Sequence, residues 1–130
     1  MAPALVLDAS AVLRLITHDL MARDWAEQLG QAPLVLAPEL MLTEVANALW
    51  KLRRSAGLAG MDPQQLLADA IDLVDQIEPD RHLQVEALAL ACHLNHPVYD
   101  CLYLALARRE AALLLTADQR LQRLADQVLP

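Results

Sequence analysis

Glycine and serine are scarce in this sequence, and their scarcity excludes several kinds of active site. The three glycines, Gly30, Gly57 and Gly60, form no glycine-rich loop that could cradle a phosphate. The two serines, Ser10 and Ser55, lie outside any G-x-S-x-G pattern of a serine hydrolase. No D-x-D sequence follows the first expected strand, which counts against an aspartyl-phosphate phosphatase. The usual nucleophiles and phosphate loops are therefore missing.

Long apolar runs and paired metal-ligand motifs are also absent. No apolar run reaches the ~18 residues that a membrane span needs, and we recognise no signal peptide. The two cysteines, Cys92 and Cys101, lie in helical patterns, so we expect free, buried thiols in a cytoplasmic protein. His93 and His96 have no third ligand of matching spacing, which favours a solvated or capping pair over a zinc site.

Basic residues are outnumbered, with 10 Lys and Arg against 17 Asp and Glu and a net charge of −7. This balance argues against a protein that holds nucleic acid by general electrostatics, because phosphate contacts dominate such binding. It leaves room for an enzyme that contacts nucleic acid locally through metal ions and a small basic patch. It also suits a partner protein with a basic segment.

Short apolar strands alternate with helices along the chain. Of the 130 residues, 56% are hydrophobic, mostly Ala and Leu with no Phe, which favours one helix-rich domain with its own core. The alternation predicts a single α/β domain over residues 1–130, with helices on both faces of a parallel sheet. We expect strands at 4–7, 34–36, 77–78 and 112–115 and an edge strand at 128–129. We expect helices at about 11–16, 19–29 (ended by Gly30), 39–55, 63–75, 82–93 and 97–110, and a last helix that holds Leu121 and Leu124.

The segment from Pro97 to Ala107 is apolar on nearly every face of a helix, which predicts that it is buried. Asp100 lies near its start. An unpaired buried charge is costly, so Asp100 needs a helix N-terminus, a base or a metal as its partner. A helix cap and a metal ligand are both open at this point.

Three more acids occupy comparable places. Asp8 and Asp118 each follow a short apolar strand, so both should project at the edge of the sheet where α/β folds bind ligands. Helix capping is the alternative for Asp118. Glu44 begins a polar stripe on helix 39–55, and apolar neighbours suggest that it faces a cleft. The stripe continues through Asn47, Lys51 and Arg54.

Carboxylates that converge in one cleft would repel and would raise one another's pKa values. A divalent cation removes that cost, and Mg²⁺ or Mn²⁺ prefers carboxylate oxygens and water as ligands. Such an ion can activate a water for phosphodiester hydrolysis, so no side-chain nucleophile is required.

The four acids stand in four sequence blocks: VLDASAV at 6–12, LTEVANAL at 42–49, VYDCLYLALA at 98–107 and LTADQRL at 115–121. In order and approximate spacing, these blocks resemble the signature blocks of PIN-domain ribonucleases, above all the VapC-type toxins of bacterial toxin–antitoxin pairs. The resemblance spans nearly the whole chain.

The resemblance implies a three-layer α/β/α sandwich and Mg²⁺- or Mn²⁺-dependent endoribonuclease activity. It also implies a homodimer, an RNA substrate and a cognate antitoxin whose C-terminal arm covers the active site. Carried over by position, the catalytic and metal-binding acids are Asp8, Glu44, Asp100 and Asp118, with supporting hydroxyls at Ser10 and Thr116. Capping of a helix or turn is the alternative role for both hydroxyls.

Lys51, Arg53 and Arg54 are our candidates for RNA contact, and an ordinary solvated surface is the alternative. Two other functions stay open. One is a PIN-like RNA- or DNA-processing nuclease without a toxin role. The other is a non-catalytic acidic interaction module, in which the carboxylates are caps and surface charges and no metal response is expected.

Overall fold

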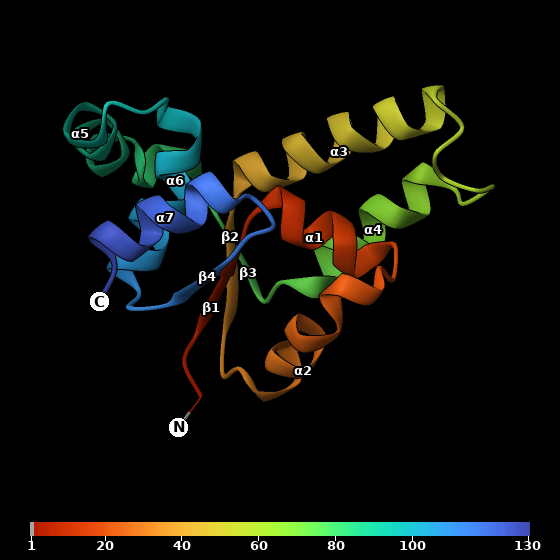
Figure 1. Ribbon diagram of the computed structural model, residues 1–130, viewed down its shortest axis with the longest axis horizontal. Helices are drawn as coiled ribbons and strands as arrows, with labels where there is room; N and C mark the ends of the chain where they lie inside the picture. Colours follow the sequence, from red (N-terminus) through yellow and green to blue (C-terminus); the bar gives the residue numbers. More distant parts are fainter. Residues whose placement is uncertain (1) are drawn as a thin grey trace.

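The computed structural model describes residues 2–130 and contains a small parallel sheet surrounded by helices (Figure 1). The strands are β1 (Leu5–Leu7), β2 (Val35–Pro38), β3 (Gln76–Glu78) and β4 (Leu113–Leu115). The α-helices are α1 (Ala9–Ile16), α2 (Arg23–Gln31), α3 (Glu39–Arg54), α4 (Pro63–Leu73), α5 (Gln84–Leu94), α6 (Val98–Arg109) and α7 (Gln119–Val128). Two 3-10 turns, η1 (Leu20–Ala22) and η2 (Asp80–His82), precede α2 and α5.

The sheet has the strand order β3-β2-β1-β4, and every neighbouring pair is parallel. The register places Val6 beside Leu36 on one side and beside Leu114 on the other. The chain therefore adds β2 and β3 on one side of β1 and then returns to add β4 on the other side. In parallel sheets, ligands bind beyond the carboxyl ends of the strands where the order reverses in this way.

Helices cover both faces of the sheet, which confirms the predicted α/β/α architecture. In Figure 1, α5, α6 and α7 lie on one side of the sheet, and α1, α2 and α4 lie on the other. Helix α3 leaves the upper end of β2 and extends outward over α1 and α4, with which it packs. The first turns of α1, α3 and α7 thus follow directly from the carboxyl ends of β1, β2 and β4, respectively.

Helix α6 is the central helix, as its all-round apolar sequence predicts. Every residue from Cys101 to Ala107 is buried, and the helix packs on β1, β2 and β4 as well as on α5. Burial of these side chains contributes on the order of 1.5–3 kcal/mol for each large apolar residue. A helix fixed in this way is a rigid platform for polar groups at its N-terminal end.

Several sequence-based boundaries differ from the structure. Helix α2 continues through Gly30 and ends at Gln31, because Gly30 keeps a helical conformation there. The expected edge strand at 128–129 is wrong, since Val128 completes α7 and the N–H of Leu129 still bonds the carbonyl of Ala125. Cys101 is buried as expected, but Cys92 is exposed on α5.

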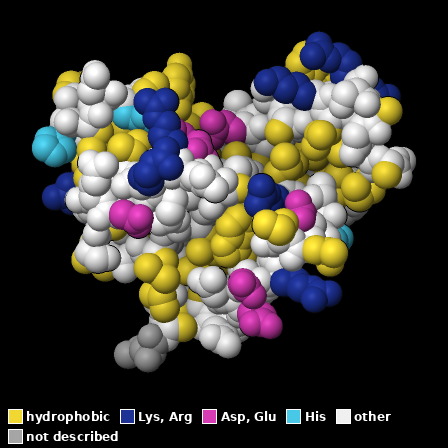
Figure 2. Space-filling model, viewed as in Figure 1, with side chains coloured by type: hydrophobic (Ala, Val, Ile, Leu, Met, Phe, Trp, Pro, Cys, Tyr) yellow, Lys and Arg dark blue, Asp and Glu magenta, His cyan; other side chains and the backbone are white. Residues whose placement is uncertain are grey.

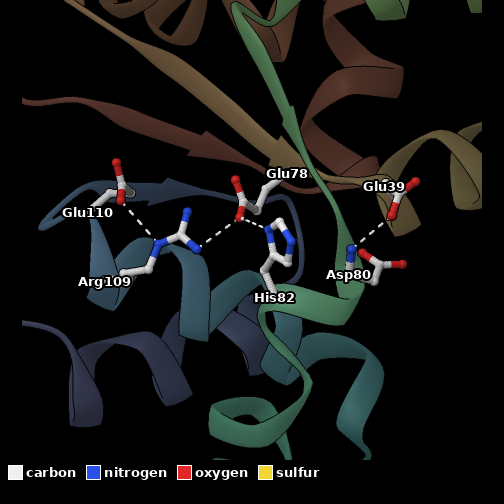
Figure 3. A network of polar contacts seen from close by, with 6 residues as sticks. All are labelled: Glu39, Glu78, Asp80, His82, Arg109 and Glu110. Carbon is white, nitrogen blue, oxygen red and sulfur yellow. Dashed lines mark hydrogen bonds and ion pairs between the residues drawn. The ribbon is translucent and has the colours of Figure 1, made fainter.

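A polar network fastens the edge strand β3 to neighbouring helices (Figure 3). Arg109, at the end of α6, donates to Glu78 of β3 at 2.9 Å and to Glu110 at 3.1 Å. His82 also contacts the Glu78 carboxylate, at 3.0 Å. The N–H of Asp80 donates to Glu39 at the start of α3. Within residues 2–130, no helix is long and apolar enough to cross a membrane.

Candidate active site

Asp8 lies directly beyond β1, and its side chain is only 5% exposed. The carboxylate caps α1 by accepting the backbone N–H of Ala11 at 2.9 Å. Two hydroxyls also donate to it, Ser10 at 2.6 Å and Thr116 at 2.5 Å. Burial raises the pKa of Asp8 above its ordinary value, and the three hydrogen bonds lower it in part. The negative charge of Asp100 raises this pKa further.

Glu44 lies on the second turn of α3 and is half-buried. Its Oε1 accepts a hydrogen bond from the Tyr103 hydroxyl of α6 at 2.5 Å. Burial raises the pKa of Glu44, this hydrogen bond lowers it, and the charges of Asp100 and Asp8 raise it further. The pKa of Tyr103 is raised far above its ordinary value, mainly by burial and then by Glu44, so its hydroxyl stays protonated.

Asp100 lies in the first turn of α6, but it does not cap the helix, because Pro97 occupies the N-cap position. Its partner is His96, whose ring nitrogen Nε2 lies 2.7 Å from Asp100 Oδ2. Since a carboxylate only accepts hydrogen bonds, Nε2 must carry the hydrogen. The left-handed Asn95 that ends α5 turns the chain so that the buried His96 ring faces Asp100. The expectation of a solvated or capping histidine at position 96 is therefore wrong.

Asp118 is the most exposed of the four acids, and its Oδ1 caps α7 by accepting the N–H groups of Arg120 and Leu121. Its own N–H donates to the hydroxyl of Thr116 at 3.0 Å, and Thr116 in turn donates to Asp8. Ser10 completes this link by accepting the N–H of Ala117 at 2.9 Å. The hydroxyls of Ser10 and Thr116 thus join the ends of β1 and β4.

The structure brings Asp8, Glu44 and Asp100 together closely enough that the charge of Asp100 raises the pKa of Asp8, and the charges of both raise the pKa of Glu44. Their donor chemistry suits a hard divalent cation, because the oxygens are anionic and mutually repelling. Across residues 2–130, Glu44, Asp100 and Asp118 each give only one oxygen to a protein donor. No three His, Cys, Asp or Glu side chains in that range are placed to hold one ion together. Mg²⁺ commonly uses one or two carboxylates and several waters, and the acids fit that open arrangement.

Basic side chains flank this acidic region. Figure 2 shows acidic side chains at a notch between α7 and α3, with Lys and Arg over α7 and over the far end of α3. The α3 group contains Lys51, Arg53 and Arg54, all exposed, and the Arg54 guanidinium lies 4.5 Å from the Trp50 ring centre. The α7 group, Arg120 and Arg123, is also exposed and was not among the residues selected from the sequence.

The comparisons that identify the family cover nearly the whole chain. A family model described as the PIN domain matches residues 5–127. The chain belongs to the PIN-domain family. A curated relative, ribonuclease VapC3 from Pyrobaculum aerophilum, is 31% identical over 119 residues, which are 90% of this chain and 91% of the relative. These matches confirm the family that the four sequence blocks resemble.

Two solved structures share this fold. The crystal structure of PAE2754 from Pyrobaculum aerophilum aligns with a TM-score of 0.70 at 23% identity, over 95% of this chain and 86% of that one. VapBC2 from Rickettsia felis, solved bound to a DNA fragment from the promoter, aligns with a TM-score of 0.61 at 15% identity, over 98% and 97% of the two chains.

Two residues of the candidate site were not found from the sequence: His96, which holds Asp100, and Tyr103, which holds Glu44. A signal existed for both, since His96 precedes Asp100 by four residues and Tyr103 follows it by three. Tyr103 stands at helical spacing from Asp100, on the side of α6 that carries it, and His96 lies two residues before the start of α6. The apolar character of the segment hid this, because Tyr103 counts as a core residue in a hydrophobicity pattern.

Proposed function

We propose that this PIN-domain chain is a metal-dependent endoribonuclease and the toxin of a toxin–antitoxin pair. The observation that carries the proposal is the cluster of Asp8, Glu44 and Asp100 at the carboxyl edge of the sheet, where burial, and then the charge of neighbouring carboxylates, raises the pKa values of Asp8 and Glu44. A relative named ribonuclease VapC3, similar over nine-tenths of both chains, supports RNA as the substrate.

The four acids, Asp8, Glu44, Asp100 and Asp118, would hold Mg²⁺ or Mn²⁺ through their carboxylate oxygens and through water. When bound, such an ion lowers the pKa of a coordinated water and stabilises charge on the phosphodiester. The protein's own contribution is placement. Ser10 and Thr116 fix Asp8 against the strand ends, and the cap of α7 fixes one oxygen of Asp118.

The RNA backbone would lie across the notch between α7 and α3. The basic groups on these two helices are placed to neutralise phosphates on either side of the acids, which otherwise repel the substrate. We assign this role to Lys51, Arg53 and Arg54 on α3, together with Arg120 and Arg123 on α7.

The proposed partner is a cognate antitoxin with a basic segment that covers the acidic notch. The net charge of −7 favours association with such a segment. The fold shared with VapBC2, which was solved on promoter DNA, supports a two-component system. We also propose a homodimer, as the family resemblance implies.

The test is cleavage of total cellular RNA by the purified protein with Mn²⁺, with Mg²⁺ and with EDTA, followed by mapping of the new 5′ ends. We expect cleavage only with metal, at defined sites, and its suppression when the antitoxin encoded beside the gene is added. Cleavage that persists in EDTA would contradict the metal mechanism. Cleavage without any neighbouring inhibitor would favour the alternative, a processing nuclease.

A further inference from the structure

We propose that Tyr103 is a positioning residue for Glu44, and that its hydroxyl holds one carboxylate oxygen so that the other faces the notch. This inference rests on the proposed metal-dependent nuclease and deepens it, because it assigns the residue that orients one of the metal-binding acids. Tyr103 itself would contact neither the metal nor RNA.

The geometry joins a rigid donor to a flexible acceptor. The Tyr103 side chain is 1% exposed and stands on α6, the buried central helix, while Glu44 stands on α3, 59 residues earlier in the chain. A glutamate loses side-chain conformational entropy when it is fixed in one conformation. The tyrosine ring is already fixed by core packing, so this hydrogen bond orders Glu44 before any ligand arrives.

The position of Tyr103 also sets the distance between two acids. Asp100 and Tyr103 are three residues apart on the same buried helix, so their side chains lie on neighbouring positions of one face. Glu44, once bonded to Tyr103, is placed relative to Asp100 by the helix itself. Asp100 is held in a comparable way, because His96 binds only its Oδ2. Both acids are therefore tied through one oxygen to a protein donor.

A tyrosine with a purely structural role needs only some hydrogen-bond acceptor for its buried hydroxyl, and a neutral carbonyl oxygen would be sufficient. Here the acceptor is a carboxylate whose charge is opposed by burial and by two neighbouring acids. This arrangement fits a role in which Glu44 stays ordered and keeps one carboxylate oxygen free for a ligand. Outer partners of metal-binding carboxylates typically change metal affinity about 10–100-fold when they are removed.

The test compares Tyr103→Phe with Tyr99→Phe, the same change on the same helix at a residue that is 62% exposed. Mn²⁺ affinity is measured by calorimetry, and RNA cleavage is measured as kcat and KM. We expect Tyr103→Phe to weaken Mn²⁺ binding about 10-fold or more and to lower kcat with little change in KM for RNA. Tyr99→Phe should leave all three unchanged.

A double-mutant cycle with Glu44→Gln separates positioning from general stability. If Tyr103 acts through Glu44, adding Tyr103→Phe to Glu44→Gln should change Mn²⁺ affinity by less than about twofold. The same fold loss in both backgrounds would overturn the inference. If Tyr103→Phe alone is too unstable to purify, the double variant is compared with Glu44→Gln directly.

The outcomes also separate this inference from the proposed function. A wild-type protein that binds Mn²⁺ and cleaves RNA, with a Tyr103→Phe variant that does both equally well, would overturn the role of Tyr103 alone. A wild-type protein that shows no Mn²⁺ binding and no metal-dependent cleavage would overturn the nuclease proposal and this inference with it.

Discussion

Glu44→Gln should make the metal-free protein more stable while it removes the activity. Glutamine keeps an oxygen that can accept the Tyr103 hydroxyl bond, but it carries no charge. In the wild type, burial and the charges of Asp100 and Asp8 raise the pKa of Glu44, which means that the ionised form is disfavoured in the folded state. Removing the charge should remove that cost.

The magnitude follows from linkage. Raising a carboxyl pKa by one costs about 1.4 kcal/mol of folding free energy at neutral pH. Glu44 is only half-buried, so solvent screening reduces the effect, and we expect a gain of about 1 kcal/mol for the variant. For a chain of 130 residues this corresponds to a Tm increase of roughly 3–4 °C.

The assay is thermal unfolding in EDTA between pH 4 and 8, followed by circular dichroism, with Glu27→Gln on the exposed face of α2 as the control. The folded-state pKa of Glu44 lies above its ordinary 4.5, so wild-type stability rises as pH falls through that window. The gap between variant and wild type should therefore be largest at neutral pH and should close near pH 4.5. A variant that is less stable than wild type at pH 7 would refute the reasoning.

Three further predictions follow from the same structure. Asp100→Asn should abolish metal-dependent cleavage with the fold intact, since asparagine still offers an oxygen to His96, and circular dichroism with an RNA assay checks both. Combined Lys51→Ala and Arg54→Ala should weaken RNA binding and flatten its salt dependence, which a salt series of binding constants measures; an unchanged slope would return these residues to the ordinary solvated surface. Arg109→Ala should cost about 1 kcal/mol at neutral pH. Arg109 holds the pKa of Glu78 below its ordinary value, so thermal unfolding should show this loss above pH 4.5 and a smaller one as pH falls.

The fold was largely predictable because its core pattern is continuous along the chain. Three-residue strands of Leu and Val end at a polar residue, and α6 is apolar on every face, so burial dictates both. The boundaries at Gly30 and Val128 were less predictable. Glycine is a weak helix breaker when the rest of the turn is hydrogen-bonded. At the end of α7, the two apolar residues Val128 and Leu129 are too short a pattern to tell the last helical turn from an edge strand.

The candidate site could be predicted from the sequence at the residues whose chemistry is unusual for their position. An acid after a buried strand, such as Asp8, or at the start of an apolar helix, such as Asp100, contradicts the local pattern and so attracts notice. Asp118 is ambiguous because capping explains it equally well, and the structure places its carboxylate as the cap of α7. Sequence patterns report the type of residue at a place, and they do not report how two such places face each other.

The positioning residues show why the rest of the site needed coordinates. The bond between Tyr103 and Glu44 joins two helices, and nothing in either helix alone requires it. His96 acts through a local turn, but its burial depends on how α5 packs against α6. A tyrosine in an apolar helix and a histidine before a proline each satisfy an ordinary core pattern. Their use as donors to Glu44 and Asp100 arises only when the tertiary fold places a carboxylate opposite each one. The residues hardest to find from a sequence are therefore those that serve the core and the candidate site at once.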